Sequence, residues 1–189
     1  MHKWVEIARK DEAAGVAEIP GGADHPRIVE YNRYVKYGTP GDDEAWCAKC
    51  VNAWFEEAGI KGTNSARARS FETWGVPLHS PIPGCVVVYW RGNPNSGSGH
   101  VHLYEREDET HIYGRGGNQS NKVCVAPYEK DRVLCFRWPA GIPIPEPEAE
   151  QGVMIAMEDA RALREKFAET AKLLQEWADE LGEALEGVA

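Results

Sequence analysis

Three residues have the side chains and the chain order of a nucleophilic hydrolase. Cys47 lies where a polar segment ends and an amphipathic one begins, so its thiol is expected at a helix N-terminus, which lowers a thiol pKa. His100 starts a strand-like segment, and Asn118 follows two glycines about one strand later. An imidazole can take the proton of a thiol, and a carboxamide can orient the imidazole. We therefore expect Cys47 as nucleophile, His100 as general base and Asn118 as the orienting residue.

Neighbouring residues leave alternatives open at this site. Gln119 competes for the orienting role, because either amide can accept a hydrogen bond from the imidazole N–H. His102 lies two residues after the expected base and therefore on the same strand face, either as a hydrogen-bonded neighbour on the rim or as a supporting or substrate contact. We expect the backbone N–H of Cys47 and one upstream group, for which Tyr34 is a candidate, to form the oxyanion hole.

The segment Cys47-Ala48-Lys49-Cys50 is also a CxxC at a helix start, which fits two other kinds of chemistry. Redox motifs of this type follow a buried apolar strand, whereas residues 39–45 form a polar segment. A zinc site normally needs a second CxxC or a matching histidine pair, and the sequence has neither. A three-ligand metal site from Cys47, His100 and His102 is a weaker alternative. We expect no metal and no organic cofactor.

The elements that must position these residues follow a helices-first order. Apolar periodicity predicts helices over residues 2–14, 46–58 and 66–71, with a shorter one between 28 and 35. After Pro81, β-branched and aromatic residues gather in short segments that predict strands over 85–90, 101–106, 110–113, 122–126 and 133–138. We expect an α+β domain over residues 1–139, in which helices precede an antiparallel meander of about five strands.

A linker and a long helix are expected after this domain. Regularly spaced prolines predict an extended linker over residues 140–152. Residues 153–188 repeat apolar positions at alternating steps of three and four, and Thr170 is the single polar residue in that stripe. This spacing predicts a coiled-coil helix. Further apolar residues flank the stripe, which favours a homo-oligomer of three or four chains.

Charge and hydropathy argue against two classes of partner. The net charge is −9, and residues 141–189 hold 12 acidic and 4 basic residues, or −8, so the first 140 residues are nearly neutral. Without a basic patch we expect no nucleic-acid partner. The longest apolar run, residues 85–90, is too short to cross a membrane, and we expect none as a partner.

The N-terminus and the cysteine count bear on the compartment. Residues 1–6 lack the apolar core of a signal peptide, so we expect a chain made in a bacterial cytoplasm without an export signal. The five cysteines are then expected as free thiols. Cys85, Cys124 and Cys135 lie in strand-like segments and are expected as small core residues.

A series of short motifs in residues 1 to about 140 carries a family resemblance. In order they are Trp4 with Ala8; Gly15-Val16-Ala17-Glu18-Ile19 with Gly21; His25-Pro26-Arg27-Ile28; Trp46-Cys47-Ala48; Ala58-Gly59; Ser70-Phe71 with Trp74-Gly75; Pro83-Gly84; Gly99-His100-Val101; and Gly116-Gly117-Asn118-Gln119. In order and spacing this series resembles the NlpC-type and CHAP cell-wall peptidases, especially a branch common among phage lysins. The resemblance implies a papain-like cysteine hydrolase fold and hydrolysis of an amide bond in peptidoglycan. His102 departs from it, since relatives usually carry a small residue there.

The combined reading is a phage or prophage endolysin that cleaves bacterial peptidoglycan after release through a holin or a similar route, in the periplasm or cell wall. The bond is either the muramoyl–alanine amide or a peptide bond. A secreted antibacterial amidase effector is the second setting. A non-catalytic, virion-associated protein oligomerised by residues 153–188, and a redox protein, remain as other classes.

Overall fold

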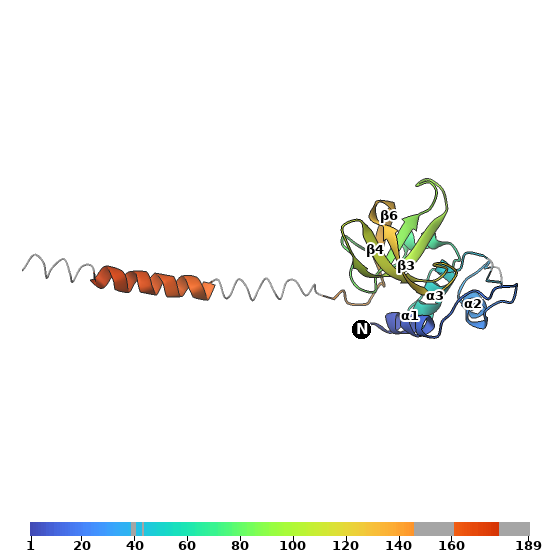
Figure 1. The fold of residues 1–189 in the computed structure, drawn as a ribbon, viewed down its shortest axis with the longest axis horizontal. Helices are drawn as coiled ribbons and strands as arrows, with labels where there is room; N and C mark the ends of the chain where they lie inside the picture. The colour runs from blue at the N-terminus through green and yellow to red at the C-terminus, as the bar shows by residue number, and fades with distance from the viewer. Residues whose placement is uncertain (39–40, 43, 146–160, 178–189) are drawn as a thin grey trace, which may run out of the picture. The chain divides into compact units, whose positions relative to one another are not determined.

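Helical elements come first along the chain and strands follow, as the sequence predicts. The computed structural model in Figure 1 describes residues 1–38, 41–42, 44–145 and 161–177. Its elements are, in order, α1 (Lys3–Ala13), α2 (Pro26–Tyr31), the 3-10 helix η1 (Asn32–Tyr34), α3 (Cys47–Glu57), the 3-10 helix η2 (Ala68–Thr73), β1 (Val76–Leu78), β2 (Val86–Trp90), β3 (Gly99–Glu107), β4 (His111–Gly116), β5 (Cys124–Glu129), the 3-10 helix η3 (Lys130–Arg132) and β6 (Val133–Trp138).

All neighbouring strands pair antiparallel in one sheet with the order β1-β6-β2-β3-β4-β5. The α+β class is therefore confirmed, and two details of the sequence prediction are wrong. β1 is a sixth strand, which the sequence hid because it is three residues long and contains Pro77. β6 does not pair with β5 to continue the meander. It lies between β2 and β1 on the other side of the sheet.

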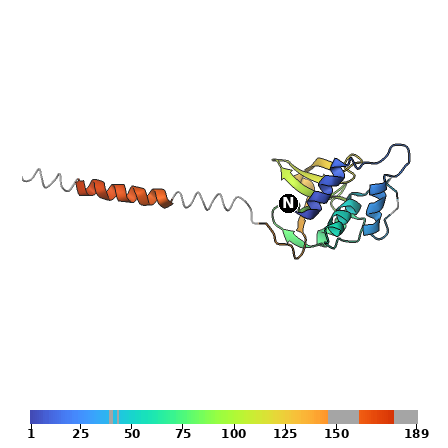
Figure 2. The same cartoon turned by 90° about the horizontal axis from the view of Figure 1, so that it is seen from below.

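Helix α3 packs against strand β3 and against both α1 and α2, and it lies between these two helices in Figures 1 and 2. Every residue from Cys47 to Phe55 is buried, so the helix packs on all sides over its first two and a half turns. A polar side chain buried in this way costs free energy unless it is hydrogen-bonded. Asn52 bonds to the carbonyl oxygens of Ala48 and Ser65, at 2.8 and 3.1 Å, and holds the loop that follows α3.

The chain divides into two compact units, Met1–Ile144 and Pro145–Ala189. The first unit extends five residues into the predicted linker, because Trp138 Nε1 donates to the carbonyl oxygen of Ile142 at 3.0 Å. In the second unit residues 161–177 are helical, and the rest of the predicted helix 153–188 lies outside the described residues. None of the helices in the described part of the chain is long and apolar enough to cross a membrane.

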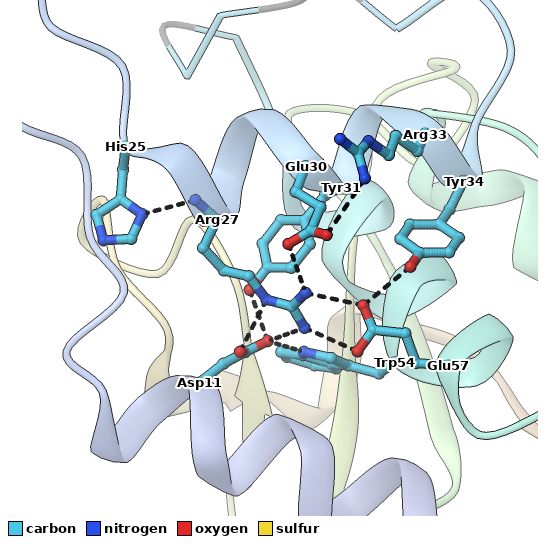
Figure 3. Close-up of polar contacts among 9 residues, drawn as sticks. All are labelled: Asp11, His25, Arg27, Glu30, Tyr31, Arg33, Tyr34, Trp54 and Glu57. Atoms are coloured by element: carbon cyan, nitrogen blue, oxygen red, sulfur yellow. Dashed lines mark hydrogen bonds and ion pairs between the residues drawn. The ribbon is translucent and has the colours of Figure 1, made fainter.

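An ion-pair cluster joins the three helices α1, α2 and α3, as Figure 3 shows. Arg27, on α2, donates to both carboxylate oxygens of Asp11 on α1, at 2.9 and 3.1 Å. It also donates to both oxygens of Glu57 on α3, at 2.8 and 2.9 Å, and to Glu30 at 3.1 Å. Burial alone would lower the pKa of Arg27, but the hydrogen bonds from Glu57 and Asp11 raise it. The cluster therefore fixes α1, α2 and α3 relative to one another.

Three uncharged donors complete the cluster. Tyr31 and Trp54 donate to Asp11 Oδ2, at 2.8 and 2.7 Å, and Tyr34 donates to Glu57 Oε1 at 3.1 Å. The Asp11 side chain is 10% exposed, so these bonds replace most of the water that its charge would otherwise need. Removing the cation would leave two carboxylates facing each other in a poorly hydrated space.

Arg27→Ala should therefore lower the free energy of unfolding by about 3 kcal/mol, because it strands two partly buried carboxylates. Arg33→Ala is the matched control: that side chain is 77% exposed and reaches only Glu30, at 3.6 Å. It should cost less than about 0.5 kcal/mol. Urea unfolding followed by circular dichroism measures both. Equal losses in the two variants would mean that the cluster does not hold the helices.

Candidate active site

Cys47 is the first residue of α3, as the sequence predicts, and is 3% exposed. The preceding residue, Trp46, makes no side-chain cap on the helix, so the first N–H groups of α3 are left without a capping side chain. Trp46 instead fixes the helix start: its Nε1 donates to Glu18 at 2.9 Å, and its ring stacks on Tyr31 at 6.2 Å. The thiol is thus held at a rigid helix N-terminus.

The electrostatics of the Cys47 thiol differ from the sequence-based expectation. Burial raises its pKa, and the backbone N–H groups of Val101 and Ala48 and the positive charge of Arg91 only partly oppose that rise. The N–H groups at the start of the helix lower the thiol pKa, as expected. This effect is smaller than the rise in pKa that burial of the thiolate causes. At neutral pH the free protein holds a protonated thiol.

His100 is the second residue of β3 and is buried. The N–H of Val101, the next residue, faces the Cys47 sulfur, and the proximity of Cys47 also raises the pKa of Tyr128, for which burial is the largest cause. The Tyr128 ring in turn stacks on the imidazole of His100, with 4.5 Å between centroids and 8° between planes. Burial lowers the pKa of His100 to about 4, so its imidazole is neutral at pH 7.

Gln119, rather than Asn118, is the carboxamide that contacts His100. Gln119 Oε1 lies 2.9 Å from His100 Nε2, and its side chain is buried. Its Nε2 donates to the carbonyl oxygens of Gly114 and Cys124, at 3.1 and 2.5 Å. Asn118 has φ +56° at the turn after β4 and is the left-handed residue there. The structure thus corrects the expected orienting residue by one position, because the turn directs consecutive side chains differently.

The hydrogen bonds of the Gln119 side-chain amide also determine the tautomer of His100. With both N–H groups of the amide given to carbonyl oxygens, its own oxygen must face the histidines and can only accept. His100 Nε2 must therefore carry the proton, and His100 Nδ1 keeps its lone pair. A neutral imidazole in this tautomer can take a proton at Nδ1.

His102 is fully buried and not at the rim. Its Nδ1 lies 3.3 Å from Gln119 Oε1, and its Nε2 lies 2.9 Å from the hydroxyl of Tyr89. Since Oε1 only accepts, Nδ1 donates to it and Nε2 accepts from Tyr89. Burial is the largest cause that lowers the pKa of His102, to about 3, and His100 adds to it. His102 therefore helps to hold the Gln119 side-chain oxygen in place.

Two glycines, Gly114 on β4 and Gly117 just after it, give this cluster its space. A Cβ on Gly114 would lie 2.4 Å from three atoms of the His102 ring. A Cβ on Gly117 would lie 2.3 Å from the Trp46 ring and 2.5 Å from Cys50 Sγ. Larger residues at these positions would displace the imidazole support or the start of α3.

Tyr34 does not contribute to an oxyanion hole at this site. Its hydroxyl is bonded to Glu57 at the C-terminal end of α3, about 15 Å along the helix from Cys47. The number of residues between Tyr34 and Cys47 suggested proximity, but the chain places Tyr34 at the opposite end of α3. The backbone N–H of Cys47, at the uncapped helix start, remains the donor that the structure offers for an oxyanion.

The alternatives built on the CxxC can be examined in the same geometry. Within the described ranges no group of three or more His, Cys, Asp or Glu side chains could hold a metal ion. Cys50 is a free thiol, donates to the carbonyl oxygen of Cys47 at 3.0 Å and has a pKa raised well above its ordinary value by burial. Of the three cysteines expected in the core, Cys85 is buried, whereas Cys124 and Cys135 are partly exposed.

Sequence reasoning missed Tyr89 and Tyr128. Tyr89 is the cross-strand partner of His100 and so shares its face, a relation that needs the register of β2 and β3. Tyr128 lies beyond the predicted end of its strand, because β5 runs to Glu129 rather than to residue 126. Nothing local in the sequence marks it as a neighbour of His100.

No protein-family model matches this chain, and no curated protein matches it.

The ionisation of Cys47 gives a testable pH dependence. Because the thiol pKa is raised and His100 is neutral, the rate of alkylation of Cys47 by iodoacetamide should rise about tenfold per pH unit between roughly pH 7 and 9. Peptide mass spectrometry follows Cys47 alone, and the same peptide in denatured protein is the reference. A rate that is already constant below pH 7 would instead indicate a preformed thiolate–imidazolium pair.

Proposed function

We propose that the Met1–Ile144 unit is a papain-like cysteine hydrolase that cleaves an amide bond in the peptide part of peptidoglycan. One observation carries the chemical part of this proposal: Gln119 accepts from His100 Nε2 and so leaves the Nδ1 lone pair free to accept a proton, on the residue next to Val101, whose N–H faces the Cys47 sulfur. A nucleophile, a base and an orienting amide are thereby present in the required order. The motif resemblance to NlpC-type and CHAP peptidases supports the choice of peptidoglycan.

The neutral resting state defines the order of the proton transfers. As the sulfur of Cys47 attacks the carbonyl carbon, the thiol proton moves to His100 Nδ1, and Gln119 stabilises the resulting imidazolium through Nε2–H. The N–H of Cys47 bonds the developing oxyanion. His100 then protonates the leaving nitrogen as the C–N bond breaks. Water hydrolyses the thioester after giving a proton to His100, which returns the thiol to its protonated form.

A phage or prophage endolysin is the setting that we propose, with a secreted antibacterial effector as the alternative. Either would act on the cell wall after release from the cytoplasm, as an endopeptidase or as an N-acetylmuramoyl-L-alanine amidase. Mass spectrometry of the fragments from digested peptidoglycan distinguishes these bonds, because each cleavage leaves a different new amine.

Cys47→Ala should abolish fragment release from peptidoglycan, a loss of roughly 10³-fold or more, because binding and oxyanion stabilisation alone remain. Cys50→Ser is the matched control: it alters the second cysteine of the CxxC but leaves the nucleophile. It should keep most of the activity, and so should the unmodified protein in EDTA. If Cys50→Ser is as inactive as Cys47→Ala, a redox function of the two cysteines replaces the proposed hydrolase. If EDTA abolishes the activity and zinc restores it, a metal site is favoured instead.

Gln119→Ala should lower the rate of fragment release on the order of 10²-fold, because His100 loses the acceptor that fixes its tautomer. Asn118→Gly is the matched control, since glycine adopts the φ of +56° at that turn without strain. It should retain nearly full activity. If both variants unfold at similar urea concentrations, the difference between their rates reports catalysis and not stability. A larger loss in Asn118→Gly than in Gln119→Ala would contradict the assignment.

We further propose that the C-terminal helix associates with copies of itself as a coiled coil. In residues 161–177 the stripe positions are exposed: Leu163 57%, Phe167 67%, Leu174 60% and Trp177 65%. Their spacing of four, three, four and three places them on one side of the helix, with Thr170 between them. A bare apolar stripe of this size is stabilised when another helix covers it.

Full-length protein should therefore run as a complex of three or four chains in light scattering at micromolar concentration. Leu174→Glu should convert it to monomer, because a carboxylate cannot be buried in the stripe without a partner. Ala168→Glu, exposed on the same helix but outside the stripe, should leave the complex intact. A full-length monomer would show that the stripe does not mediate self-association.

A further inference from the structure

Arg91 lies immediately after β2, next to the strand that carries His100. Its backbone N–H donates to the carbonyl oxygen of Ser98 at 3.2 Å, and its own carbonyl oxygen accepts from the Ser96 hydroxyl at 2.9 Å. The preceding residue, Trp90, pairs with Gly99. Both sides of the Arg91 backbone are thus fixed against the segment that leads directly into His100.

The charge of Arg91 acts on groups from three different elements of the site. Burial is the largest cause of each altered pKa, and the positive charge of Arg91 is a further cause that lowers the pKa of Cys47 on α3, His100 on β3 and Tyr128 on β5. The strand register places the side chain in agreement with this: Arg91 follows Tyr89 by two residues and so leaves the chain on the face that Tyr89 shares with its cross-strand partner His100.

This cation has no partner within the described residues: the Arg91 side chain is exposed and makes no hydrogen bond or ion pair there. Other arginines of the same unit are paired, for example Arg69 with Glu72 and Arg115 with Glu12. An exposed arginine is usually only solvated, but this one stands beside a thiol and an imidazole that are both neutral at pH 7. The start of α3 adds its own positive end to the same region.

We infer that Arg91 binds a carboxylate of the substrate, so that the amide attacked by Cys47 lies next to a free carboxylate group. This inference rests on the proposed hydrolase function and specifies the substrate class of the same site. A guanidinium can hold a carboxylate through two parallel N–H···O bonds, which fixes orientation as well as charge. With neutral groups around the thiol, no negative side chain among those described at the site would oppose such a ligand.

The test compares two synthetic peptide fragments that contain the bond identified by fragment analysis. They are identical except that the carboxylate beside that bond is free in one and a carboxamide in the other. The intact protein should hydrolyse the carboxylate form with a kcat/KM about 10- to 100-fold higher, the range that a hydrogen bond between charged partners contributes. The preference should shrink as salt is added, because the cation is exposed.

Arg91→Gln should reduce the ratio of the two kcat/KM values to about twofold or less, whatever common change the lost charge causes on both substrates. Arg132→Gln is the matched control: its guanidinium stacks on Trp90, the neighbour of Arg91, at 5.3 Å, and pairs with Glu129 at 2.6 Å. It should keep the full preference. The comparison of two substrates separates binding from thiol ionisation, since a change in the Cys47 pKa would affect both forms equally.

The inference is overturned if the unaltered protein hydrolyses both forms equally well, or if the preference persists in Arg91→Gln. An equal loss on both substrates would also overturn it and would assign Arg91 to thiol ionisation alone. In each of these cases the hydrolase function itself stands. Failure of the unaltered protein to hydrolyse either form would instead refute the proposed function, and the inference with it.

Discussion

The guanidinium of Arg27 is the point at which three helices of the Met1–Ile144 unit are held together, since it bonds carboxylates from α1, α2 and α3. Buried ion pairs are costly unless every charge is satisfied, and here tyrosine and tryptophan donors take the remaining lone pairs. The cluster fixes the C-terminal end of α3 through Glu57, while Trp46 fixes its start. With both ends held, the helix cannot rotate, and the Cys47 thiol stays against β3. The position of the Cys47 thiol therefore depends on a polar contact at the opposite end of its helix.

A second buried polar network determines what the thiol faces. The Gln119 amide has its donors fixed by two backbone carbonyl oxygens, and this forces its oxygen toward His100 and His102. The arrangement satisfies each group without any net charge, which suits a site whose burial depresses the pKa of both histidines. Burial keeps His100 neutral at pH 7, and burial of Cys47 raises the pKa of its thiol. A substrate that brings a carboxylate to Arg91 would enter a site otherwise composed of neutral groups.

The sequence was sufficient for features that depend on local pattern. The α+β order, the start of α3 at Cys47 and the strand that carries His100 follow from periodicity and turn residues, and the structure confirms them. Features that depend on register were not predictable in this way. Asn118 and Gln119 are adjacent, and only the turn conformation decides which of them faces the imidazole. Tyr34 lies at a plausible distance before Cys47 in sequence but at the far end of α3 in space. Tyr89 and Tyr128 reach the histidines through strand pairing, which no single segment encodes.

The central claim is that Cys47 forms a covalent thioester with the acyl part of a peptidoglycan amide. The most direct measurement is intact-protein mass spectrometry after rapid acid quenching of the protein mixed with peptidoglycan fragments, followed by mapping of the modified peptide. The account predicts an added mass equal to the acyl fragment, located on Cys47 and absent from the other four cysteines. Turnover of the fragments with no such adduct under any quench time, or an adduct located on another residue, would contradict the account.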